Sequence, residues 1–213
     1  MLLPAAAAAA MALAYPGGSE AFRKECRRKL FHQGIFLYLG AYFILGHPAF
    51  AWWMAGWTLL VGVGETLRLK AAWAKPFFDR LFSGIIREKE ARRFSGTFYV
   101  ALGLVLTAFI NGSDPALMTA GVLYLSLGDA VSPLVGLRFG VGRYTVFGTL
   151  RSVDGTLAGF AVAFLVGVAT GFSPWASLGA AAAFSFVDTF PVRPDDNFWI
   201  PLVGSTALRL LSR

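Results

Sequence analysis

The 213-residue sequence has only one cysteine and two histidines, so the common metal-binding and disulfide patterns are absent. The single thiol, Cys26, cannot form an internal disulfide, and no companion Cys or His stands at the spacing of a zinc site. We expect Cys26 to be an ordinary small residue. The Walker A pattern and the loop signatures of protein kinases are also missing, which excludes the common soluble phosphate-binding motifs.

Charged residues are scarce as well. They make up 15% of the chain, whereas 56% is hydrophobic, and the mean hydropathy is +0.61. A soluble domain needs more polar surface than this to cover its core. Because the apolar runs are continuous rather than alternating, we predict an all-α polytopic transmembrane helical bundle that forms one domain, 1–213.

Several apolar runs are long enough to cross the roughly 30 Å of hydrocarbon when tilt is allowed. Residues typical of tight turns, such as Gly, Pro and Asn, separate them. Run 2–15 has no basic residue before it, so we expect an uncleaved short helix rather than a signal peptide. The runs predict seven to eight helices, at about 2–15, 33–46, 49–66, 97–110, 116–134, 155–171 and 175–190, with a weaker one at 198–211.

The basic residues, 19 Lys and Arg against 12 Asp and Glu, gather in alternate connections. Connection 16–32 carries five, 67–96 carries eight, 135–154 carries three and 191–197 carries one, while the short turns carry none. The positive-inside rule explains this excess without a nucleic acid partner, and it predicts a cytoplasmic basic face with the N-terminus outside. We therefore expect an integral protein of a prokaryotic inner membrane.

Acidic residues inside or beside the apolar runs are the strongest functional candidates. Asp129, which follows Gly128, lies within a run where burying a charge is costly, so a functional role is the default interpretation. Downstream come Asp188 and then Asp195-Asp196-Asn197 beside hydrocarbon. Hard oxygen ligands of this kind suit Mg²⁺, which would hold phosphates. The alternative is a solvated loop in which Asn197 is a helix N-cap.

Two basic segments next to the spans are candidates for phosphate binding. Arg138, Arg143 and Arg151 follow glycine-containing stretches, whose backbone N–H groups and guanidinium groups suit a phosphate. Upstream, Arg23–His32 leads directly into the second span, and anchoring to anionic headgroups is its plainer role. An ion pair likewise explains Glu65 and Arg68, which lie three apart on one helical face.

In their order along the chain, these segments resemble the family of dolichol kinase, phytol kinase and yeast-type CTP-dependent diacylglycerol kinase, which is related to the phosphatidate cytidylyltransferases. The motifs span about 23–206. The resemblance implies a membrane-bound phosphotransferase that moves the γ-phosphate of CTP, with Mg²⁺, to the hydroxyl of a long-chain lipid. The acceptor would be phytol, dolichol, a polyprenol or diacylglycerol.

The resemblance also implies roles for individual residues. Asp129, Asp195 and Asp196 would hold the metal and act in catalysis, with one of the carboxylates as the base. Arg151 departs from the family, which often has Lys before this Ser-x-Asp-Gly motif, but the charge is kept. Residues expected to contact the nucleotide or its phosphates are Arg28, Lys29, His32, Glu65, Arg68, Gly128, Gly136, Arg138, Arg143, Arg151, Ser152, Asp154, Gly155 and Asn197.

Two other functions stay open from the sequence. A cytidylyltransferase would use the same metal, CTP and membrane site to make a CDP-lipid and release pyrophosphate. A small transporter would use Asp129 on an ion or solute path, although the gathering of charge on one face argues against a conduit. Neither the lipid acceptor nor the oligomeric state, homo-oligomers included, follows from the sequence.

Overall fold

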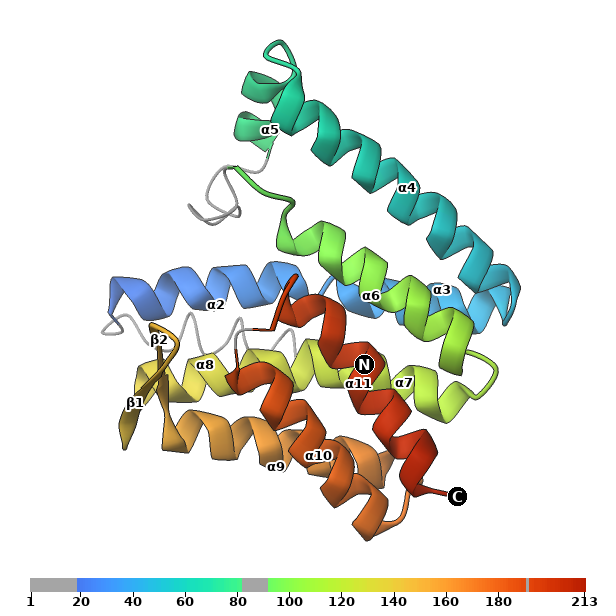
Figure 1. The fold of residues 1–213 in the computed structure, drawn as a ribbon, viewed down its shortest axis with the longest axis vertical. Coiled ribbons are helices and arrows are strands. Elements are labelled where there is room, and N and C mark those ends of the chain that lie inside the picture. The colour runs from blue at the N-terminus through green and yellow to red at the C-terminus, as the bar shows by residue number, and fades with distance from the viewer. Residues whose placement is uncertain (1–18, 82–91, 191) are drawn as a thin grey trace.

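The computed structural model describes residues 19–81, 92–190 and 192–213, and this part of the chain is mostly helical (Figure 1). The expected helix at 2–15 lies outside the described residues. Every other predicted apolar run forms a helix. The elements in order are α2 (Glu20–His32), α3 (Ile35–Leu45), α4 (Ala49–Lys70), α5 (Lys75–Leu81), α6 (Gly96–Asn111), α7 (Pro115–Leu123), η2 (Tyr124–Gly128), α8 (Asp129–Arg138), β1 (Arg143–Val146), β2 (Thr149–Ser152), α9 (Val153–Ala169), α10 (Pro174–Thr189) and α11 (Asp196–Leu211).

Local sequence explains where the helices begin. The Asp114 carboxylate caps α7 by accepting from the Ala116 N–H at 2.8 Å, and Ser173 caps α10 in the same way through Ala176 at 3.2 Å. A proline follows each cap, where its fixed φ and missing N–H suit the first helical position. The turns predicted from Asn, Ser, Gly and Pro therefore lie where the helices are interrupted.

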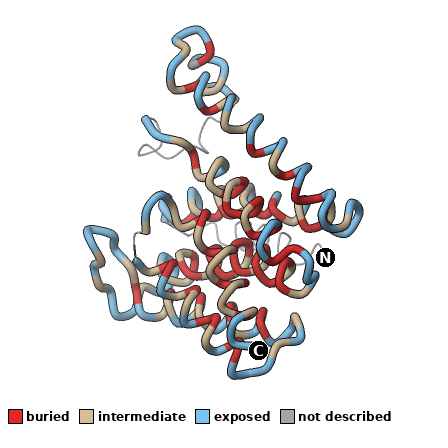
Figure 2. The backbone as a smooth tube through the Cα atoms, turned by 45° about the vertical axis from the view of Figure 1, so that its right-hand side comes forward, coloured by how far each residue is buried: buried red, intermediate tan, exposed pale blue. Residues whose placement is uncertain are grey.

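The core of the bundle forms around α11, which packs against α10, α6 and α7, while α9 packs between α8 and α10. Close approach requires a small residue: a Cβ on Gly103 of α6 would lie 2.6 Å from the carbonyl oxygen of Phe198. Figure 2 shows the buried residues concentrated in this body. In contrast, α4 and α5 project away from it in Figure 1.

Three segments differ from the sequence-based prediction, and one of them is α5, which lies within the expected connection 67–96. The basic connection 16–32 is largely the helix α2, and the connection 135–154 contains a β-hairpin in which Val146 pairs with Thr149. Only a narrow stripe of α2 is buried, and it includes Cys26 at 1% exposure. Cys26 contacts apolar neighbours in a small cluster with Phe22 and Leu134, as expected for an ordinary small residue.

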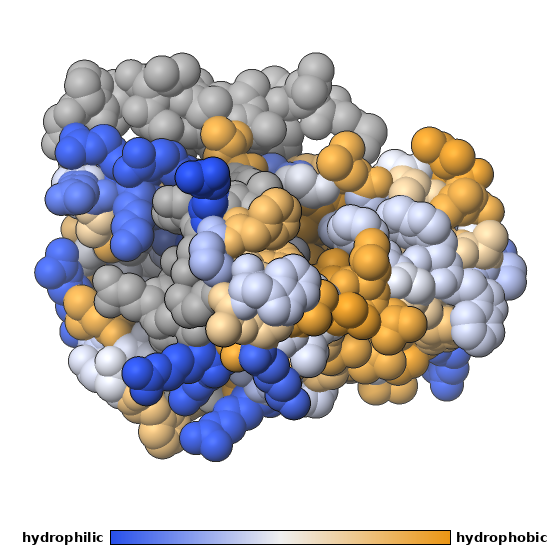
Figure 3. Space-filling model, turned by 90° about the horizontal axis from the view of Figure 1, so that it is seen from above, coloured by the Kyte–Doolittle hydropathy of each residue, from blue (hydrophilic) through white to orange (hydrophobic). Residues whose placement is uncertain are grey.

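One helical segment in the described part of the chain is long and apolar enough to cross a membrane. It is the continuous stretch Pro115–Arg138, which has 24 residues. Its most apolar 18 residues have a mean hydropathy of 1.4, and 61% of them are buried inside the protein. Gly96–Asn111 and Val153–Ala169 are shorter apolar helices. The space-filling view shows hydrophilic residues gathered on its left and apolar side chains over its centre and right (Figure 3). The polytopic arrangement and its orientation stay predictions.

Candidate functional site

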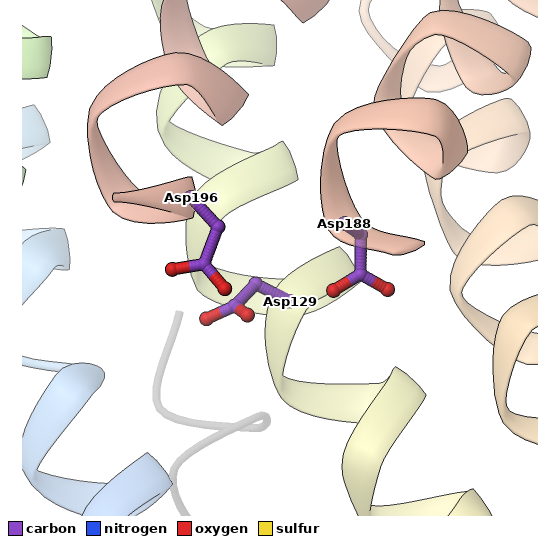
Figure 4. A group of neighbouring side chains, drawn as sticks. All are labelled: Asp129, Asp188 and Asp196. Carbon is purple, nitrogen blue, oxygen red and sulfur yellow. The ribbon is translucent and has the colours of Figure 1, made fainter. Parts of the chain in front are cut away.

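Three carboxylates from three helices meet at one point (Figure 4). Asp129 begins α8, Asp188 lies in the last turn of α10, and Asp196 begins α11. One oxygen from each lies within 4.8 Å of the others, which is close enough for a shared cation. The structure thus brings together Asp129 and Asp196 of the predicted metal site and adds Asp188 to them.

Asp195 lies beside this group and has a different environment. Its Oδ1 accepts from the backbone N–H of Asn197 at 3.1 Å and from Asn197 Nδ2 at 2.6 Å, so Asp195 is the N-cap of α11. The alternative from the sequence was Asn197 as the N-cap, and the structure has the cap two residues earlier, at Asp195. Burial and the adjacent Asp196 carboxylate raise the pKa of Asp195 to about 7.

A π-helix sets the position of Asp129. The turn η2 ends at Gly128, where a Cβ would lie 2.7 Å from the Phe184 ring, so no side chain fits without movement. The side chain of Gln33 donates from Nε2 to the Ser126 carbonyl within η2 at 2.9 Å. Such insertions in α-helices are frequent at functional sites, and here the insertion directly precedes the buried carboxylate.

Helix α2 supplies the partners of Asp129. Lys29 is 1% exposed and forms a buried ion pair with Asp129 Oδ2, and His32 Nε2 lies 3.5 Å from the same oxygen. Burial lowers the pKa of Lys29, and burial together with the Lys29 charge lowers the pKa of His32 to about 4. The imidazole is therefore neutral at neutral pH. Lys29 therefore holds Asp129, and neither Lys29 nor His32 of the predicted basic motif lines the cavity described below.

Asp129 and Asp196 line a cavity of about 670 Å³, and Asp188 is not among its lining residues. Asp188 forms part of its supporting network, because Ser132 Oγ donates to Oδ2 at 2.7 Å and Arg151 Nη1 lies 3.4 Å from Oδ1. Positive side chains surround the acidic group. The lining includes five arginines, Arg28, Arg93, Arg143, Arg151 and Arg193, together with Glu25, Asp129, Asp195 and Asp196.

Gly136, Ser152 and Gly155 also line the cavity, through close packing of α8 against α9. A Cβ on Gly136 would lie 2.6 Å from Ser152 Oγ, and that hydroxyl accepts from the Gly155 N–H at 3.3 Å as the N-cap of α9. Asp154 and Arg138 are not among the lining residues. The Arg138 guanidinium lies 5.5 Å from the centre of the Phe139 ring.

Glu65 and Arg68 lie outside the cavity lining and join α4 to the start of α6. Glu65 accepts from Ser95 N at 3.0 Å and Ser95 Oγ at 2.8 Å, and Arg68 Nη2 donates to it at 2.7 Å. Arg68 Nη2 also donates to the Arg93 carbonyl at 2.5 Å. This buried pair therefore fixes the backbone segment that carries Arg93, one of the cavity arginines.

Comparison with known proteins relates the chain to a lipid kinase over part of its length. It is 33% identical to a phytol kinase of Synechocystis sp. over 123 residues, which cover 55% of this chain and 50% of that relative. The match thus spans half the length of the phytol kinase. An uncharacterized protein of Rickettsia prowazekii is 28% identical over 197 residues, covering 86% of this chain and 93% of the relative. No protein-family model matches, and no solved structure matches significantly.

Proposed function

We propose that this chain is a membrane-bound lipid-alcohol kinase that transfers the γ-phosphate of CTP to the hydroxyl of a phytol-, dolichol- or polyprenol-like isoprenoid alcohol, or of diacylglycerol. The similarity to a phytol kinase supports the reaction class. The choice of CTP and of an isoprenoid acceptor rests on the family resemblance of the motifs around Asp129, Ser152 and Asp196.

The observation that carries the proposal is the meeting of Asp129, Asp188 and Asp196 beside a cavity that Asp129 and Asp196 line together with five arginines. Phosphoryl transfer needs mainly positioning and neutralisation of charge. Three carboxylates form a donor set of hard oxygens that fits Mg²⁺, and Ser132 and Lys29 already orient two of them. A bound Mg²⁺ would neutralise charge on the phosphates.

Each group of side chains then has a task. We assign Asp129, Asp188 and Asp196 to the metal and the cavity arginines to the phosphate oxygens, which guanidinium groups bind well. Asp195 lines the cavity but stands outside the metal-binding trio, so we assign it the hydroxyl proton. The bond between the γ-phosphorus and the bridging oxygen of CTP breaks, the lipid oxygen bonds to that phosphorus, and the lipid's proton passes to Asp195.

We further propose that the apolar helices cross a plasma membrane, with the cavity at the cytoplasmic face. Large apolar side chains are exposed on several helices; for example, Leu37 of α3 is 77% exposed, Trp52 of α4 is 69% and Trp175 of α10 is 82%. Soluble monomers rarely leave contiguous apolar surface in water. Burial of these side chains in lipid would also bring a lipid hydroxyl to the cavity by diffusion within the bilayer.

One assay tests donor, acceptor and reaction together. Purified protein is incubated with γ-labelled CTP or ATP, Mg²⁺ and a panel of lipid alcohols, and we expect label on the lipid with CTP. Formation of a CDP-lipid and pyrophosphate from phosphatidate would instead assign the cytidylyltransferase activity, which could use the same cavity. Absence of transfer from both nucleotides to every alcohol would overturn the kinase proposal.

A further inference from the structure

A shallow apolar groove adjoins the carboxylate cavity. It has a volume of about 430 Å³ and is lined by Phe147, Phe190, Val192 and Arg193. The last three residues also line the carboxylate cavity, so the two spaces share a wall. Volumes of about 300–1,000 Å³ are usual for small-molecule sites. The groove is therefore large enough for part of a ligand whose other end occupies the cavity.

The residue at the tip of the hairpin is unusual for its backbone position. Val146 pairs with Thr149, which leaves Phe147 and Gly148 as a two-residue turn with φ values of +46° and +80°. Turns of this kind favour Asn, Asp or Gly, and a bulky side chain at positive φ is an outlier. Phe147 is nevertheless present, with its side chain 83% exposed. Local strain of this kind commonly marks a functional position.

We propose that the groove between Phe147 and Phe190 binds the hydrocarbon chain of the lipid alcohol where that chain leaves the carboxylate cavity. The inference rests on the proposed kinase function. The hydroxyl must reach Asp195 among charged side chains, whereas the attached chain needs apolar walls. The hairpin supplies such walls beside the cavity, and Leu150, which is 63% exposed and lines the cavity, continues them.

The substitution Phe147→Asn separates this role from a contribution to stability. Asn tolerates a positive φ better than Phe, so the thermal unfolding temperature should stay the same or rise. We expect kcat/KM for a long-chain isoprenoid alcohol to fall by about tenfold or more, since an apolar contact of one aromatic ring is lost. The KM for a short-chain alcohol that does not reach the groove should change by less than about twofold, and so should the KM for CTP.

Two further variants complete the test. Phe147→Leu keeps an apolar side chain and should retain most of the long-chain preference. Trp175→Asn removes an equally exposed aromatic residue, 82%, from the start of α10, and it should leave the ratio of long-chain to short-chain activity unchanged. Equal losses on long and short alcohols in Phe147→Asn, or an unchanged ratio, would overturn the groove assignment.

A second readout does not require turnover. A long-chain alcohol that carries a photoactivatable group along its chain should crosslink to the hairpin, and Phe147→Asn should reduce this crosslink several-fold. If the wild-type protein phosphorylates no alcohol but gives this crosslink, the kinase proposal fails while the lipid groove stands. If it phosphorylates alcohols but crosslinks only elsewhere, the groove fails and the kinase proposal stands.

Discussion

Asp188 is held from two directions inside the protein. Ser132 donates to one of its carboxylate oxygens at 2.7 Å and Arg151 approaches the other at 3.4 Å. If it is also a metal ligand, Asp188→Asn removes one negative charge from the metal-binding trio while keeping the shape of the side chain. We expect kcat to fall by about 100-fold or more, the usual scale for loss of a group that stabilises charge in the transition state.

The same assay gives the control for Asp188. Asp114→Asn at the N-cap of α7 makes an identical chemical change in a residue whose carboxylate accepts from the first turn of its own helix. Asn caps helices about as well as Asp, so activity and stability should be close to those of the wild type. Activity of Asp188→Asn within a few-fold of that of Asp114→Asn, at every Mg²⁺ concentration, would remove Asp188 from the metal site.

The buried pair between Lys29 and Asp129 predicts a stability effect with a characteristic non-additivity. Lys29→Met leaves the Asp129 carboxylate buried without its cation, and breaking such a pair costs about 3–5 kcal/mol. For a chain of this size the thermal midpoint of the detergent-purified protein should fall by roughly 6–20 °C. In the double variant with Asp129→Asn most of the loss should be recovered, because no charge is left unpaired.

Lys24→Met is the matched control for this cycle, since Lys24 is exposed on the same helix. It should shift the midpoint by no more than a degree or two. If Lys29→Met and the double variant are equally unstable, the loss comes from packing around α2 and the ion pair contributes little.

The sequence identified part of the carboxylate group for a clear physical reason. Asp129 lies within an apolar run, and the cost of burying its charge makes it a functional candidate. Asp188 satisfies the same criterion near the end of the next-to-last run, so its place in the carboxylate group could have been predicted. Asp195 could not have been separated from Asp196, because the choice between capping and facing Asp129 depends on backbone dihedrals that two adjacent identical residues do not reveal.

The contact between α8 and α9 depends on the absence of one side chain. A Cβ on Gly136 would lie 2.6 Å from Ser152 Oγ, but its next neighbours are 3.8 Å or more away. Gly136→Ala should therefore destabilise the protein by about 1–3 kcal/mol through overpacking. In a Ser152→Ala background, which itself loses an N-cap at about 1 kcal/mol, the obstructing hydroxyl is gone. There Gly136→Ala should cost nothing, or stabilise by up to about 1 kcal/mol through helix propensity.

Equilibrium unfolding of the two single variants and the double variant measures this coupling. Additive losses would mean that α8 and α9 separate when either residue changes, and that the hydroxyl is not the obstacle. Because both residues line the carboxylate cavity, the double variant also shows whether restored packing restores activity.

Helix positions were predictable from the sequence wherever long apolar runs exist, as in 49–66 and 155–171. Hydrophobic runs bounded by turn residues determine such helices largely by themselves. The helix α2 was missed because it is mostly polar, and only a few residues such as Cys26 are buried. The hairpin was missed because its turn contains Phe147 where a sequence pattern for hairpins expects Asn or Gly.

The arrangement of the bundle separates its two ends chemically. The carboxylate cavity lies where α10 ends and where α8, α9 and α11 begin. The opposite end consists of short turns and of Asn111, whose Nδ2 donates to Ser205 Oγ at 2.9 Å. Arg209 donates to the Ile110 carbonyl at 2.6 Å and so satisfies the last turn of α6 there. Charged side chains at the end opposite the cavity thus bind helix termini, whereas those at the other end surround the carboxylate cavity.

This separation predicts how the protein sits in a membrane. In a Cys26→Ala background, Ser113→Cys places a thiol in the exposed turn between α6 and α7, and Thr145→Cys places one on the exposed face of the hairpin. Basic connections stay in the cytoplasm. An impermeant maleimide, added to cells whose outer membrane is permeabilised and whose inner membrane is intact, should therefore label Ser113→Cys. Thr145→Cys should react only after the inner membrane is lysed. Labelling of both thiols before lysis would exclude the prediction that the two positions lie on opposite sides of the inner membrane. The reverse pattern would place the carboxylate cavity outside, where no CTP is available to a kinase.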